Sequence, residues 1–129
     1  MTENFYRRMF LVASVWNIAG GAVIAIFGGW IFARGGVSFP TPPAYFHSWI
    51  ALFMVFGIGY YMVYRDMYRN KNIVILGIIG KLAFAIIFSY NMIAYRNQVP
   101  TFFLIPLIGD LVFVVLFWAF LNFARNEGR

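Results

Sequence analysis

Lys81 and Asp110 each lie inside a long apolar stretch of this 129-residue chain. An ionisable side chain in such a stretch costs several kcal/mol unless it is paired or hydrated, so it marks a candidate functional site. Either group could act as an acid or base, or could hold the polar end of a ligand. The full set of candidate intramembrane polar or ligand-binding residues is Asn17, Tyr60, Asp66, Lys81, Asn91 and Asp110.

Side-chain direction favours Asp66 over Asp110 as the partner of Lys81. Side chains on a helix lean toward its N-terminus. The apolar stretches that hold Lys81 and Asp110 run in opposite directions across the membrane, so these two side chains lean apart. Asp66 lies at the C-terminal end of its stretch, so its side chain leans back into the membrane, toward Lys81. We therefore expect a Lys81–Asp66 pair, with Asp110 as the open alternative for Lys81. The residues expected beside this pair are Asn17 and either Tyr60 or Tyr64.

Two further alternatives concern the carboxylates. Asp66 could pair with Arg65 or Arg69 in its own turn instead of with Lys81. Asp110 could meet a polar residue near the far end of the bundle, could face a water-filled cavity, or could be neutral and protonated. The residues within reach at that end are Asn91, Arg34, Arg96 and His47.

A proline and a glycine precede Asp110 and bear on the local backbone. Pro106 removes an amide donor, and Gly109 leaves space beside the backbone. Irregular backbone inside a membrane is tolerated where it lines a cavity. The sequence therefore predicts a locally loosened helix and an Asp110 that faces the interior of the bundle.

Several kinds of chemistry have no residues to support them. The chain has no cysteine, which excludes disulfide exchange, iron–sulfur clusters and thiolate metal sites. His47 is the single histidine, and bis-histidine haem or zinc needs more ligands than this. We expect no metal site and no cofactor.

Composition places the chain in a membrane. Hydrophobic residues make up 63% of it and charged residues only 11%, against about a quarter charged in soluble domains. Apolar runs of about 18 residues or more are typical of transmembrane helices. The predicted fold class is all-α: a single integral-membrane domain, an up-down bundle of four transmembrane helices. The predicted spans are about 9–33, 45–64, 73–95 and 101–123.

Matches between the two halves of the chain, such as Gly20 with Gly80 and Ala25 with Ala85, also allow two tandem helical hairpins, 1–64 and 65–129. Tryptophans and tyrosines near the ends of the predicted spans are interpreted as interface residues. This interpretation covers Trp30, Tyr45, Trp49 and Tyr95.

Basic residues predict the orientation. Arg34 and Arg96 alone lie on one side of the predicted bundle, and the other side carries Arg7, Arg8, Arg65, Arg69, Lys71, Arg125 and Arg129. Positive charge stays in the cytoplasm, so both termini should be cytoplasmic, in an inner (plasma) membrane. The net charge of +6 is thus explained by topology and lipid headgroups, and we expect no nucleic-acid partner.

Short motifs support a resemblance that covers nearly the whole chain. They are WNxxGG at 16–21, GIGY at 57–60, RD at 65–66, GxxGK at 77–81 and GD at 109–110. Together they resemble an uncharacterised group of short bacterial four-span membrane proteins. The chain is also similar, more distantly, to the DoxX-like four-helix membrane proteins. The resemblance implies the four-span fold and marks Asp66, Lys81 and Asp110, but it names no activity.

The favoured function is therefore non-enzymatic. We expect a small multi-pass protein that binds or passes a small or lipophilic ligand, or that acts as an accessory subunit of a larger membrane complex or homo-oligomer. The alternative is a small membrane enzyme on a lipophilic substrate, with Lys81 and Asp110 as acid–base groups.

Overall fold

The computed structural model describes all 129 residues and contains no strand. Its helices are α1 (Glu3–Arg34), α2 (Ala44–Arg65), α3 (Lys71–Ala94) and α4 (Leu104–Asn126), with a short 3-10 turn, η1 (Thr101–Phe103), directly before α4. All four are long and apolar enough to cross a membrane. The predicted all-helical fold with four long helices is confirmed, and the helix ends lie within a few residues of the predicted spans except at the N-terminus.

Helix α1 begins well before the predicted span because the start of the chain carries a cap. The Thr2 hydroxyl accepts a hydrogen bond from the Phe5 amide at 3.3 Å, and Glu3 lies in the first turn. Both features stabilise a helix N-terminus, since they satisfy free N–H groups and complement the helix dipole. The charged first turns are therefore helical although they are not apolar.

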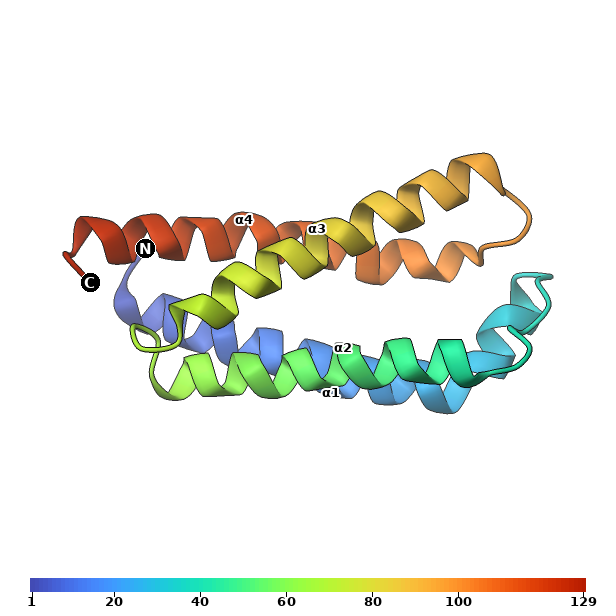
Figure 1. Cartoon of the computed structure of the whole chain (residues 1–129), viewed down its shortest axis with the longest axis horizontal. Coiled ribbons are helices and arrows are strands. Elements are labelled where there is room, and N and C mark those ends of the chain that lie inside the picture. The colour runs from blue at the N-terminus through green and yellow to red at the C-terminus, as the bar shows by residue number, and fades with distance from the viewer.

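The four helices run up and down, so that both termini and the α2–α3 turn lie at one end of the molecule (Figure 1). Side-chain contacts hold this end together. The Arg7 guanidinium donates to the Tyr64 carbonyl at 2.9 Å, and Glu3 pairs with both Arg7 and Arg129 at 3.4 and 3.8 Å. We call this the basic end; its basic residues are Arg7, Arg8, Arg65, Arg69, Lys71, Arg125 and Arg129.

The helices associate mainly as two pairs, α1 with α2 and α3 with α4, and the contact between α2 and α3 is sparser. Gly57 allows α1 and α2 to approach closely. A Cβ there would lie 2.6 Å from the Ile18 side chain and 2.9 Å from Asn17 Cβ. The Ser14 hydroxyl also donates to the Gly57 carbonyl at 2.8 Å. Small residues at helix contacts are the usual means of close packing in membrane bundles.

Two apolar clusters fill the interior, one toward each end. The cluster at the basic end has Phe10, Phe117 and Phe120 at its centre. The cluster at the opposite end contains Ile24, Ile50 and Phe103, among others. The buried polar side chains lie between the two clusters, on α1, α3 and α4. These are Ser14, Asn17, Lys81 and Asp110.

Candidate functional site

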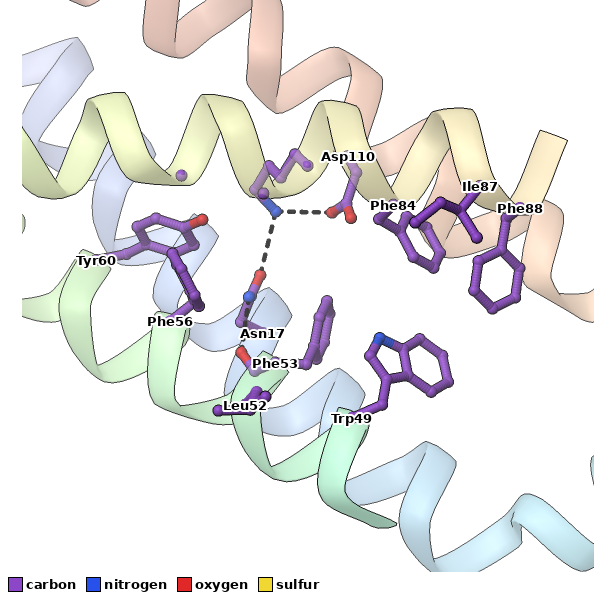
Figure 2. Close-up of a pocket in the computed structure, with 13 residues that line it drawn as sticks. Asn17, Trp49, Leu52, Phe53, Phe56, Tyr60, Phe84, Ile87, Phe88 and Asp110 are labelled. Carbon is purple, nitrogen blue, oxygen red and sulfur yellow. Dashed lines mark hydrogen bonds and ion pairs between the residues drawn. The ribbon is translucent and has the colours of Figure 1, made fainter. Parts of the chain in front are cut away.

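A buried ion pair joins α3 to α4 in the middle of the molecule. The Nζ atom of Lys81 lies 2.7 Å from Oδ1 of Asp110, and the two residues are only 4% and 2% exposed. Lys81 also donates to Oδ1 of Asn17 at 3.3 Å, and the Asn17 amide donates to the Phe53 carbonyl at 2.9 Å (Figure 2). One chain of hydrogen bonds therefore runs through all four helices.

The expected Lys81–Asp66 pair is wrong. Asp66 is exposed and ends α2 with extended backbone, at φ −150° and ψ 92°. Its carboxylate accepts from the Arg69 amide at 3.2 Å, within its own turn. The direction rule for helical side chains does not apply to a residue that has already left the helix. In addition, the flexible four-carbon stem of Lys81 carries its ammonium to within 2.7 Å of Asp110.

The polar partners proposed for Asp110 are also wrong. Asn91 donates to the Ile87 carbonyl of its own helix at 2.8 Å, and the Arg34 guanidinium lies over the Trp30 ring at 5.7 Å. His47 and Arg96 are exposed. Asp110 does face the interior of the bundle, as the sequence predicted. It needs none of these more distant partners, because the Lys81 ammonium balances the charge of its carboxylate.

The backbone before Asp110 is not loosened as predicted. Pro106 is the third residue of α4, and the first N–H groups of a helix have no partner within it, so this proline removes no helical hydrogen bond. Gly109 has a different role: a Cβ at this position would overlap the indole ring of Trp16. The glycine lets Trp16 of α1 pack against α4 beside the ion pair.

A cavity of about 350 Å³ opens beside the ion pair, mainly between α2 and α3. Its polar floor is formed by Asn17, Tyr60, Lys81 and Asp110. Its wall is aromatic and is shown in Figure 2: Trp49 stacks on Phe84 with ring centres 5.9 Å apart and planes at 12°, and it also packs on Phe88 at 5.4 Å. The remaining aromatic lining is Phe53 and Phe56.

The exposed lining residues of this cavity lie on α2 and α3, so its mouth is between these two helices. Leu52 of α2 and Ile87 of α3 line it and are 62% and 57% exposed. Gly80, also exposed, lies on the same rim. The opening corresponds to the sparse contact between α2 and α3.

The floor of the cavity retains hydrogen-bonding capacity. The Lys81 ammonium has three donors, of which Asp110 and Asn17 accept two. The Tyr60 hydroxyl makes no hydrogen bond with another residue, although Tyr60 is buried and its ring lies 5.3 Å from Lys81 Nζ. The floor can therefore both donate to and accept from a polar group in the cavity.

Sequence reasoning missed part of the wall. Trp49 was interpreted as an interface residue, but it is half-buried and lines the cavity. The signal was present: Trp49, Phe53, Phe56 and Tyr60 recur at the helical spacing of four, three and four residues, which places them on one face of α2. Phe84 and Phe88 share the face of α3 that carries Lys81 in the same way.

Of the predicted site residues, the structure brings together Asn17, Tyr60, Lys81 and Asp110 and leaves Asp66 and Asn91 apart. Fold and site define a class: an all-helical protein whose four helices are long enough to span a membrane, with a central ion pair and a lateral cavity. Comparisons with protein-family models, with curated proteins and with solved structures found no match.

Proposed function

We propose that this is a multi-pass membrane protein that binds a small, neutral, lipophilic ligand in the cavity between α2 and α3. The observation that carries the proposal is the cavity itself, with an aromatic wall and a polar floor. Ligand sites are typically concave and mostly apolar, with a few polar groups that fix orientation.

The membrane location is supported by the outer surface of the helices. Large apolar side chains are exposed on all four of them, for example Ile26, Val55, Ile86 and Val115. A surface of this kind is stable in lipid. The polar backbone groups must then form their hydrogen bonds within the protein, and an α-helix provides these bonds. We place both termini in the cytoplasm because the basic end carries most of the arginines and lysines. The motif resemblance to short bacterial proteins favours a bacterial inner membrane.

The ion pair argues for a neutral ligand. Lys81 and Asp110 already balance each other's charge. A charged ligand beside them would leave an uncompensated charge in an apolar interior, and that is costly. A polar group such as a hydroxyl or carbonyl can instead use the free donor of Lys81 and the Tyr60 hydroxyl, while a flat apolar body packs against Trp49 and Phe84.

The positions of the mouth and of the two apolar clusters suggest how the ligand reaches the cavity. The opening between Leu52 and Ile87 faces the direction that lipid would occupy. The apolar cluster at the basic end closes the interior there, whereas toward the opposite end a second cavity of about 250 Å³ shares Trp49 and Phe88 with the cavity between α2 and α3. We therefore propose binding from within the bilayer, and not passage along the bundle axis.

Mass spectrometry of lipophiles that co-purify in mild detergent tests this function. Gly80→Leu fills the mouth, since a Cβ there would make only an ordinary contact with Phe56 at 3.9 Å. Gly29→Leu is the matched control, because Gly29 has no neighbour within 4 Å and lies away from the cavity. We expect a neutral compound to co-purify with the wild type and, in the same amount, with Gly29→Leu. The amount that co-purifies with Gly80→Leu should be at least fivefold lower. Equal amounts in all three proteins would refute the proposal.

A further inference from the structure

We propose that a second site, a groove between α1 and α4 at the basic end, holds one anionic phospholipid, with its phosphate on Arg8 and an acyl chain along the groove. This site is separate from the cavity between α2 and α3 and does not depend on the ligand proposed there. It shares with that proposal only the membrane location of the helices.

The groove has the shape and lining that an acyl chain requires. Its volume is about 640 Å³, and α1 and α4 form its two sides. Met9 and Phe113, both buried, form the floor, and the exposed residues Phe5 and Val12 line the α1 side. From Arg8 to Val12 the helix rises by about 6 Å. An acyl chain whose phosphate lies on Arg8 can therefore enter the groove there and run toward the centre of the molecule.

The polar lining residues of the groove, Thr2, Asn4 and Arg8, lie at the N-cap or within the first two turns of α1, where the apolar Phe5 also lines it. The part of the groove toward the centre of the molecule is lined by Val12 and Val112. This arrangement places one polar, positively charged end next to an apolar trough. An anionic amphiphile matches both parts, whereas an inorganic anion would leave the trough empty.

Arg8 differs from its neighbour Arg7 in having no partner in the protein. Arg7 is bound to the Tyr64 carbonyl and to Glu3. The nearby acid Glu3 is thus shared between Arg7 and Arg129. Arg8 is exposed and makes neither an ion pair nor a hydrogen bond, and it lies on the rim of the groove. A guanidinium binds phosphate in bidentate fashion, and basic residues next to a bilayer attract anionic headgroups.

The test is native mass spectrometry of the full chain in mild detergent, titrated with phosphatidylglycerol and with phosphatidylcholine of the same acyl chains. Arg8→Gln removes the proposed phosphate ligand. Arg125→Gln is the matched control, because it removes the same charge at the same end from an exposed residue outside the groove. Val12→Trp fills the groove, and Val23→Trp, at another exposed valine of α1, controls for the added ring.

We expect the wild type to retain phosphatidylglycerol at least fivefold more than phosphatidylcholine. Arg8→Gln should abolish this preference and Val12→Trp should lower retention of both lipids, while the two controls stay within twofold of the wild type. Arg8→Gln should melt at the wild-type temperature, since Arg8 is exposed and has no ion pair or hydrogen bond within the protein to lose. Equal losses in Arg8→Gln and Arg125→Gln would show a diffuse charge effect and overturn the proposal, as would the absence of a preference. If soluble glycerol phosphate displaced the lipid, the headgroup alone would account for binding, and the proposed role of the groove in holding an acyl chain would be overturned.

Discussion

The ammonium of Lys81 and the carboxylate of Asp110 lie 2.7 Å apart, at the level where the two apolar clusters of the bundle leave a gap. The pair joins α3 to α4, and through Asn17 it also joins both to α1. A buried pair of this kind is expensive to form and more expensive to break on one side. Variants that remove one or both partners therefore measure how much the ion pair contributes to the stability of the fold.

Lys81→Met should destabilise the protein strongly, because Asp110 would lose its counter-charge while still buried. Removing one partner of a buried pair typically costs about 3–5 kcal/mol, whereas replacing both partners by apolar residues can be nearly neutral. The double variant Lys81→Met with Asp110→Leu should therefore recover a large part of the loss. Thermal unfolding in detergent, followed by circular dichroism, measures both effects.

The matched control for this cycle is Lys81→Met with Asp66→Leu. Asp66 is exposed and bonded within its own turn, so its replacement should recover nothing. Recovery with Asp66→Leu but not with Asp110→Leu would contradict the pairing seen in the structure.

Tyr60→Phe should weaken ligand binding without weakening the fold. The substitution removes only the hydroxyl, which makes no hydrogen bond within the protein and lies at the floor of the cavity. A hydrogen bond to a ligand is worth about 0.5–1.5 kcal/mol, so the retained amount of the co-purifying lipophile should fall about twofold to twelvefold. An unchanged amount would exclude the hydroxyl from ligand binding, and an unchanged melting temperature is the check on the fold.

Gly57→Ala should loosen the contact between α1 and α2. The new methyl group would lie 2.6 Å from the Ile18 side chain and 3.1 Å from the Ile18 amide nitrogen, and overpacking of this kind typically costs about 1–3 kcal/mol. Gly20→Ala is the control, since nothing lies within 4 Å of that position. In a helix interior this change stabilises by about 0.5–1 kcal/mol. Thermal unfolding should shift in opposite directions for the two variants.

Both termini should be cytoplasmic. A reporter fused after Arg129 should read as cytoplasmic, and one inserted in the loop 35–43 should read as external, because basic residues are concentrated at the end that holds the termini. The reverse pattern would show that the bundle is inverted. It would also move the proposed lipid groove to the outer leaflet.

The sequence by itself determined the four helices and their approximate ends. Long apolar runs separated by charged or proline-rich segments leave few other structures available to the chain. Three- and four-residue spacing also puts Asn17 on one helix face with Gly20, and Lys81 on one face with Gly77. Small residues mark the faces at which membrane helices meet, and both polar side chains are buried in the structure. Periodicity is sufficient for such statements because it fixes the angular position of a side chain on its own helix.

Tertiary structure alone decided the partner of Lys81 and the existence of the cavity. Both depend on the tilt and axial shift of one helix against another, which the periodicity within a single helix does not encode. Side-chain direction in the sequence favoured Asp66 as the partner of Lys81, but the packing of α3 against α4 brought Asp110 within 2.7 Å. The lateral cavity exists for the same reason, because α2 packs closely on α1 through Gly57 and only sparsely on α3.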